Sequence, residues 1–153
     1  MIELRPIRAL SADALDPLLA ASIAEGLRFV ARLAHEWAAG AARFDGPGEV
    51  LLGGYDRAAL VAVGGLTPDP YGGAPGVGRL RHLYVLPAAR RRGVGRRLVR
   101  ALEAAAAGHY RVLVLRTDTA AAAGFFEALG YEPLPLDGTA THRRELGPAT
   151  PTV

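Results

Sequence analysis

The sequence predicts a single-domain protein of the mixed α/β class, and three observations lead to this prediction. The chain has 153 residues, half of them apolar, which suffices for one sizeable core and excludes two large domains. Some segments show the alternating or continuous apolar residues of strands, whereas others repeat apolar residues at helical spacing. Neither an internal repeat nor a linker separates these segments. We therefore expect one domain over residues 1–147 and a flexible tail over 148–153.

Composition excludes several kinds of chemistry. All 18 basic residues are arginine, and the chain contains no Lys, Asn, Gln or Cys. This excludes lysine catalysis, disulfides, thiolate zinc sites and cysteine nucleophiles. No group of His and carboxylate residues has the spacing of metal ligands, so we expect no metal. The sequence has no long, charge-free apolar segment, and we expect a cytoplasmic protein without a membrane partner.

The first 40 residues are expected to form one strand and then helical structure with one interruption. Polar and apolar residues alternate over 2–7, which indicates the strand. Ser11 offers a helix cap, and helical spacing then continues to about Ala39 with a break near Glu25 and Gly26.

The middle of the chain predicts a β-hairpin and a loop. Apolar runs over 50–55 and 60–66 flank a short turn, a pattern typical of a hairpin. Residues 68–78 include three prolines and four glycines. We therefore expect a loop there that is long enough to cover a neighbouring site.

Strands and helices alternate in the second half. A strand over 80–86 is stopped by Pro87, and helical spacing begins at Gly93. The continuous apolar run over 112–115 indicates a central strand. The remaining expected elements are a helix over 120–129, ended by Gly130, and two closing strands over 131–136 and 139–146.

Positive charge is concentrated in one segment. Residues 79–100 hold eight arginines and no acidic residue, whereas the rest of the chain has ten arginines and fifteen acids. The segment thus carries a charge of +8 and the remainder −5. This distribution predicts an anion site, for either a nucleic acid backbone or a small phosphorylated ligand.

The turn before the helix from Gly93 has the composition of a phosphate-binding cradle. Free backbone N–H groups converge where a helix begins, and the helix dipole is positive there. Gly93 and Gly95 let the backbone approach a ligand closely, and neighbouring arginines add charge-assisted hydrogen bonds. The turn is not a P-loop, because no Gly-Lys-Ser/Thr follows. Leu98 also stands where a dinucleotide fingerprint has its third glycine.

Arg90, Gly93 and Gly95 follow the pattern Arg/Gln-x-x-Gly-x-Gly/Ala, and the turn resembles the acyl-CoA-binding motif of the GNAT superfamily of N-acetyltransferases. The preceding Leu83-Tyr84-Val85-x-Pro87 is similar to the family's fourth strand. The resemblance implies a GNAT-like fold with a mixed sheet of six to seven strands, splayed between strands 4 and 5 and flanked by about four helices. A homodimer is compatible with it. Residues that resemble the family's fifth strand, fourth helix and closing Gly-Phe/Tyr are Leu115-Arg116-Thr117, Ala122, Phe125, Phe126 and Gly130-Tyr131.

The resemblance also implies a function, namely transfer of the acetyl group of acetyl-CoA to an amine of a small molecule or a peptide N-terminus. The amine would attack the thioester directly in a ternary complex, so the enzyme would supply proximity, backbone donors and a route for protons. The pyrophosphate is expected on the amides of the turn and the pantetheine arm between the fourth and fifth strands. By carry-over, the residues expected to bind acetyl-CoA are Leu83, Val85, Arg90, Arg91, Arg92, Gly93, Val94, Gly95, Arg96, Thr119 and Phe126.

The sequence departs from the family pattern at three places. Phe126 stands where many relatives have a tyrosine that protonates the departing thiolate. Thr119 stands where an asparagine often precedes the fourth helix, and its hydroxyl can still cap that helix. Arg79 and Arg81 occupy the usual positions of the base, and neither accepts a proton at neutral pH. The resemblance therefore leaves the base unassigned.

Three residues are candidates for proton transfer, each with a structural alternative. His82 lies in the fourth strand, but alternation places it on the face opposite Arg81 and Leu83, which favours a structural role. Tyr84 shares that face and has a hydroxyl to offer, although a packed strand aromatic is the commoner outcome. His142 falls in the last closing strand, which would border the acceptor pocket.

The acceptor site is expected beside the early helical segments, which wall it in the family. The candidate acceptor-binding residues are Glu25, Arg28 and Arg81, and the carboxylate of Glu25 would suit a cationic amine. Trp37 in the same segment is better explained as a core residue.

Two other functions compete with the enzyme. A nucleic-acid-binding module would use 90–100 as a basic face, but this segment lacks the interleaved aromatic residues of a single-strand binder, so we expect no nucleic acid partner. A CoA-binding sensor without turnover would explain Phe126 and the missing base. A panel of amine acceptors distinguishes the sensor from the enzyme.

Overall fold

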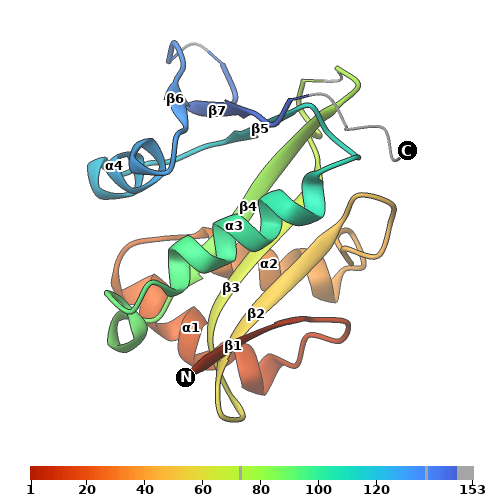
Figure 1. Ribbon diagram of the computed structural model, residues 1–153. Helices are drawn as coiled ribbons and strands as arrows, with labels where there is room; N and C mark the ends of the chain where they lie inside the picture. Colours follow the sequence, from red (N-terminus) through yellow and green to blue (C-terminus); the bar gives the residue numbers. More distant parts are fainter. Residues whose placement is uncertain (73, 137, 148–153) are drawn as a thin grey trace.

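A seven-stranded mixed sheet forms the centre of the structure, a computed structural model that describes residues 1–72, 74–136 and 138–147 (Figure 1). The strand order is β1-β2-β3-β4-β5-β7-β6, which confirms the expected fold class. The expected tail at 148–153 lies outside the described residues. The strands are β1 (Ile2–Pro6), β2 (Val50–Asp56), β3 (Ala59–Pro68), β4 (Val77–Val85), β5 (Val112–Leu115), β6 (Glu132–Pro133) and β7 (His142–Glu145). The helices are α1 (Ala12–Ala24), α2 (Phe29–Ala38), α3 (Val94–Ala106) and α4 (Ala120–Ala128), with a short 3-10 turn, η1 (Pro87–Ala89), after β4.

Helices cover both faces of the sheet and so create two hydrophobic clusters. On one face α3 packs on β2, β3 and β4 with its apolar stripe, which includes Leu98 and Leu102 (Figure 1). On the other face α1 and α2 bury a second cluster that contains Leu33 and Trp37, so Trp37 is the expected core residue. Among the residues that the structure describes, no helix is long and apolar enough to cross a membrane.

The only parallel strand pair in the described sheet, β4 with β5, separates after a short contact. The two strands pair at Val77 with Val112, Gly78 with Leu113, and Arg79 with Val114. β4 then continues for six further residues to Val85, whereas β5 ends at Leu115. This divergence is the expected splay between strands 4 and 5.

A β-bulge interrupts the pairing of β3 with β4 beside the point of divergence. Tyr84 lies opposite Val63 and Arg81 opposite Gly65, so one residue of β3 faces two of β4. His82 in this bulge has a φ of 60°, a conformation that residues other than glycine rarely adopt. The side chains of Arg81 and His82 consequently reach the same face and both approach Glu36 of α2. The prediction that His82 and Arg81 lie on opposite faces is therefore wrong.

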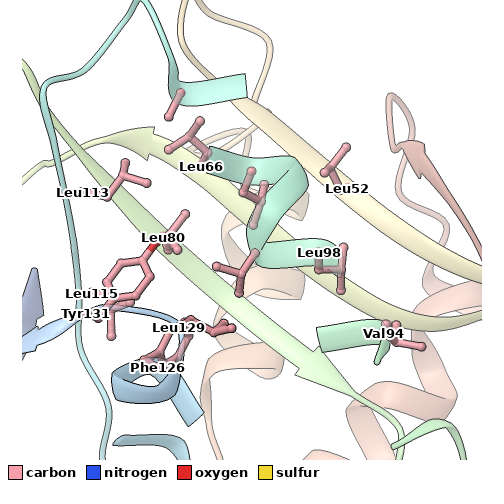
Figure 2. Packing of buried hydrophobic residues seen from close by; sticks show 14 of the residues in the cluster. Leu52, Leu66, Leu80, Val94, Leu98, Leu113, Leu115, Phe126, Leu129 and Tyr131 are labelled. Carbon is pink, nitrogen blue, oxygen red and sulfur yellow. The ribbon is translucent and has the colours of Figure 1, made fainter. Parts of the chain in front are cut away.

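The C-terminal half is fixed to α3 by apolar and charged contacts. Figure 2 shows Phe126, Leu129 and Tyr131 beside Leu80 and Leu115 in the same cluster. The carboxylate of Glu103 accepts hydrogen bonds from the Tyr131 hydroxyl at 2.8 Å and from Arg100 at 2.7 Å, and Arg144 of β7 lies 3.6 Å from it. These contacts join α3 to the segment after α4 and to the last strand.

Some element boundaries differ from the expected ones. β4 begins at Val77, inside the segment expected to be a loop, because Val77 pairs with β5 and Gly78 pairs with both β3 and β5. The two closing strands are shorter than expected, at Glu132–Pro133 and His142–Glu145.

Candidate active site

A cavity of about 980 Å³ opens where β4 and β5 diverge. Its wall includes the start of α3, the unpaired part of β4, the residues after β5 and one side of α4. It also reaches the segment between α1 and α2, on the other side of the sheet. The cavity thus connects the predicted phosphate cradle with the region expected to bind the acceptor.

The backbone at the start of α3 presents a row of free donors to this cavity. No residue in the described ranges accepts a hydrogen bond from the N–H groups of residues 91–96, and the first bonded amide is that of Arg97, 3.0 Å from the Gly93 carbonyl. Arg91 and Gly93 have φ values of 65° and 76°, and such left-handed residues turn successive N–H groups to one side. With the positive end of the helix dipole, this turn is suited to hold a phosphate or diphosphate.

Protein groups engage most of the arginines in the basic segment. Among the described residues, Arg91 and Arg96 have no hydrogen-bond or ion-pair partner, and both line the cavity beside the free amides. The unpaired positive charge of this segment is therefore concentrated at the cradle. The engaged arginines are Arg79 with Asp69, Arg81 with Glu36, Arg90 with Glu25, Arg92 with Asp56, Arg97 with the Ile2 carbonyl, and Arg100 with Glu103.

Two arginines expected in the cradle have other contacts. Arg90 donates from Nε to the Val85 carbonyl at 2.9 Å and forms a double contact with Glu25. Arg92 lies outside the cavity wall and approaches Asp56 at 3.8 Å. The reason is that acidic residues at the end of α1 and in β2, Glu25 and Asp56, lie within ion-pair distance of these side chains.

Gly93 and Gly95 are each required for a different structural reason. Gly93 is the N-cap of α3, is open to solvent on the Cβ side and needs its positive φ. At Gly95 a Cβ would lie 3.2 Å from the ring of Phe125, so this glycine lets α3 and α4 approach each other. Both glycines line the cavity as expected.

The free side of β4 supplies backbone groups along the cavity. The amide of Leu86 donates to Val61 of β3 at 2.9 Å, and backbone groups of alternate residues point to the same neighbour. Leu83 and Val85 therefore direct their N–H and C=O groups away from β3, to the side where β5 has diverged. The Val85 carbonyl is engaged by Arg90, which leaves the Val85 amide and both Leu83 groups for a ligand.

Glu25, Tyr84 and Arg90 form a cluster at the acceptor side of the cavity. The Tyr84 hydroxyl donates to Glu25, and Arg90 reaches the two Glu25 oxygens at 2.7 and 3.0 Å. The bonds from Arg90 and then Tyr84 lower the pKa of Glu25. Burial, followed by the bond to Glu25, raises the pKa of Tyr84 to about 12, so its phenol is neutral at pH 7. Glu25 is thus already paired and does not offer a free charge to a cationic amine.

His82 lines the cavity with a neutral ring. Its Nδ1 lies 3.0 Å from the Phe29 carbonyl, which only accepts, so Nδ1 carries the proton and Nε2 the lone pair. Nε2 is buried without a hydrogen-bond partner among the described residues, and Glu36 lies 3.7 Å from it. Burial and the charge of Arg81 lower the pKa of His82 to about 4.

Besides Arg92, the structure leaves two of the expected residues outside the cavity lining. His142 is buried behind the wall, with its ring nitrogens 2.9 Å from Glu127 and from Thr141. Arg28 caps α2 from an exposed position outside the cavity lining. Thr119 does line the cavity, and its hydroxyl accepts from the Ala122 amide at 3.1 Å as the N-cap of α4. Phe126 also lies in the wall, with its ring edge-on to Phe125 and Tyr131.

Sequence reasoning missed the acids that hold the strand arginines. Arg79 pairs with Asp69 at 3.3 Å and donates to the Thr139 carbonyl at 2.8 Å, which ties the loop after β3 to the segment before β7. Glu36 of α2 forms the corresponding ion pair with Arg81, at 3.3 Å. A signal was available, because arginines in a strand that is buried on both faces require counter-ions. It did not say which acid supplies the charge.

Comparisons with known proteins agree with this geometry. A family model described as an acetyltransferase (GNAT) domain matches residues 47–133. No curated protein matches the sequence.

Solved structures share the fold over nearly their whole length. A candidate acetyltransferase from Exiguobacterium sp. 255-15 has a TM-score of 0.84 and 27% identity, covering 95% of this chain and 93% of its own. A GNAT family acetyltransferase from Brucella melitensis in complex with acetyl-CoA has a TM-score of 0.68 and 21% identity, covering 99% and 92%. The PaiA N-acetyltransferase from Thermoplasma acidophilum in complex with coenzyme A has a TM-score of 0.65 and 17% identity, covering 95% and 99%. The family model spans more than half of the sequence, and the chain belongs to the GNAT acetyltransferase family.

Proposed function

We propose that the protein transfers an acetyl group from acetyl-CoA to the amine of a small molecule or of a peptide N-terminus. One observation carries the proposal. The unpartnered amides of residues 91–96, with the free guanidinium groups of Arg91 and Arg96, open onto a cavity that follows the unpaired half of β4. An anionic head on a long amide-bearing arm, as in acetyl-CoA, matches this combination.

The chain's own groups account for the binding of acetyl-CoA. The amides at the start of α3 and the two free arginines hold the diphosphate through charge-assisted hydrogen bonds. The free backbone groups of Leu83 and the Val85 amide pair with the amides of the pantetheine arm, as an additional strand would. When bound, acetyl-CoA supplies the activated thioester. These contacts orient the acetyl end toward the bulge at His82, where the acceptor side of the cavity begins.

Direct transfer to the amine is favoured because neither a cysteine nor a serine lines the cavity. The chain contains no cysteine, and its two serines have other contacts. Ser11 caps α1, and Ser22 is buried with its hydroxyl donated to the Leu19 carbonyl at 2.9 Å. Neither serine lines the cavity. The acceptor amine is therefore the group that attacks the thioester carbon.

His82 is the residue best placed to take up the proton of the amine. The residue lines the cavity, its Nε2 has a lone pair without a hydrogen-bond partner among the described residues, and Glu36 at 3.7 Å is near enough to stabilise the charge after protonation. A weak base suffices, because the attacking nitrogen becomes strongly acidic once it bonds to the carbonyl carbon. The Tyr84 hydroxyl stays protonated at neutral pH and donates a hydrogen bond to Glu25, so Tyr84 does not act as the base.

Calorimetry followed by a thiol-release assay tests the proposal. We expect micromolar binding of acetyl-CoA and much weaker binding of acetyl-pantetheine, which lacks the diphosphate. Because the chain has no cysteine, a thiol reagent reports CoA release without background from the protein. Absence of acetyl-CoA binding, with salt-dependent binding of DNA instead, would contradict the proposal. Binding of acetyl-CoA without release of CoA to any amine in a broad panel would indicate a sensor.

A further inference from the structure

The acceptor side of the cavity has apolar and basic walls and no carboxylate available to a ligand. Leu27 and Phe29 line it from the segment between α1 and α2, and Tyr71 lines it from the loop after β3. Arg90 and Tyr84 engage Glu25, as described above. Glu36 lies against Arg81 and His82 and does not line the cavity.

Arg32 is the exception among the charged groups of this region. It lies on α2, is exposed and lines the cavity, and it has no hydrogen-bond or ion-pair partner in the described part of the chain. Arg32, Arg81 and His82 all line the cavity, and the charges of both arginines oppose protonation of the His82 ring. Two arginines and one carboxylate, Glu36, leave this end of the cavity with a net positive charge.

Such an environment selects against cationic acceptors and favours an acceptor with an anion. A polyamine would bring a second positive charge to a region that already has an excess of it. A carboxylate would match the planar donor pair of a guanidinium and compensate the free charge. The same positive surroundings lower the pKa of a nearby ammonium group and so increase the fraction of the neutral amine that attacks.

We infer that the acceptor is an amine that also carries a carboxylate, as amino acids do, and that Arg32 binds this carboxylate with Arg81 beside it. The inference rests on the proposed function and names the substrate class for the same site. It replaces the expectation that Glu25 receives a cationic amine. The apolar residues Leu27 and Phe29 further favour acceptors with an apolar side chain.

The experiment compares matched acceptors in the thiol-release assay. The acceptors are the common amino acids, the corresponding amino acid carboxamides, and the polyamines putrescine and spermidine. We expect kcat/KM for the best amino acid to exceed that for its own carboxamide by about tenfold or more, the value of one charge-assisted hydrogen bond.

The variant Arg32→Gln tests whether Arg32 binds the carboxylate of the acceptor. The KM for the preferred amino acid should rise by about tenfold. The KM for the corresponding carboxamide and the KM for acetyl-CoA should not change. The matched control is Arg8→Gln, which removes another exposed arginine, outside the cavity lining. A general effect of lost charge would alter both variants alike.

The outcomes separate this inference from the proposed function. Acetyl-CoA binding with a preference for carboxamides or polyamines would overturn the inference and leave acetyl transfer intact. Acetyl-CoA binding without acetylation of any amino acid, or an unchanged KM in Arg32→Gln, would overturn it as well. Absence of acetyl-CoA binding would remove the proposed function, and the inference with it.

Discussion

His82 combines a strained backbone, a buried ring and an unpaired nitrogen at one position. Its left-handed conformation costs on the order of 1 kcal/mol or more, and such strain is concentrated at functional sites in proteins. The bulge that imposes the strain also turns the ring toward α2, where Phe29 fixes the tautomer. The same three features make the residue a sensitive point for stability.

The pKa of His82 predicts a loss of stability in mild acid. Burial and Arg81 lower this pKa to about 4 from its ordinary value of 6.5. Between these two values the unfolded chain binds more protons, so the free energy of unfolding falls as the pH falls from 6.5 to 4, by up to about 3 kcal/mol from this residue. Urea unfolding at several pH values measures the slope.

The control for this prediction is His82→Gln, which keeps a donor for the Phe29 carbonyl and removes the titration. Its stability curve should be flatter than that of the parent protein between pH 6.5 and pH 4. All other titratable groups are the same in the two proteins, so they alter both curves alike. Parallel curves would mean that His82 titrates normally.

The orientation of residues near the bulge could not be predicted from the sequence. Alternation correctly placed Leu83 opposite His82 and Tyr84, but it failed for Arg81, because an inserted residue shifts the phase of every residue before it. The left-handed His82 has no signature in the sequence, since packing against Phe29 and Phe44 holds it there. The contacts of the arginine side chains also depend on acids that are distant in the sequence, such as Glu25 and Asp69.

At the level of elements, the turn from Arg90 to Gly93 shows how a local motif becomes a site. The helix that follows begins with a left-handed glycine and has no side-chain cap, so its first amides remain available. Arg91 and Arg96 stay free because none of the acids that engage their neighbours reaches them. The cradle therefore depends on short-range geometry, which is the kind of feature that a local sequence motif can indicate.

Gly93→Glu should strongly weaken acetyl-CoA binding, because it adds negative charge beside the amides that we propose to hold the diphosphate. Gly93→Gln is the matched control, since both side chains have the same shape and impose the same cost, about 1 kcal/mol, for a left-handed backbone. We expect both variants to lose stability equally and only the first to weaken binding, by about a hundredfold or more. Calorimetry and thermal unfolding measure the two effects.

Equal binding by the Glu and Gln variants would contradict the cradle. Gly95→Glu should also weaken binding, but it is a less specific test, because its Cβ would press on Phe125 at 3.2 Å. A loss of binding at that position has two causes that the measurement does not separate.

The order and type of the elements were predictable, and their ends were less so. Helical spacing in α3 and the continuous apolar run of β5 gave correct elements because each buries one defined face. β4 extends into the glycine-rich loop because neighbouring strands pair with Val77 and Gly78, which no local signal announces. The closing strands shorten for the opposite reason, since β7 pairs over only four residues with β5.

On the scale of the whole molecule, the sheet consists of two parts that meet over three residue pairs. β1 to β4 form one part and β5, β7 and β6 the other. Arg79 stands at the last shared pair, opposite Val114, and links Asp69 on one side to Thr139 on the other. The side chains of Arg79 and Asp69 are both 7% exposed, so water compensates neither charge.

Arg79→Ala should destabilise the protein by about 3 kcal/mol, because it leaves the charge of the buried Asp69 without its ion-pair partner. The double variant Arg79→Met/Asp69→Leu should recover part of this loss, since it removes both charges. Urea unfolding measures the free energies, and hydrogen exchange should show β5 and β7 opening more readily in the single variant. A single variant as stable as the parent would show that the pair contributes nothing to joining the two parts.

The divergence of β4 from β5 leaves an interior strand with an open edge, and open edges promote aggregation through intermolecular pairing. A ligand seated in that gap would shield the edge and add its binding free energy to folding. Acetyl-CoA in the cell would then stabilise the folded enzyme and reduce its aggregation. Preparations stripped of nucleotide should accordingly scatter light at lower temperatures on heating than preparations saturated with acetyl-CoA.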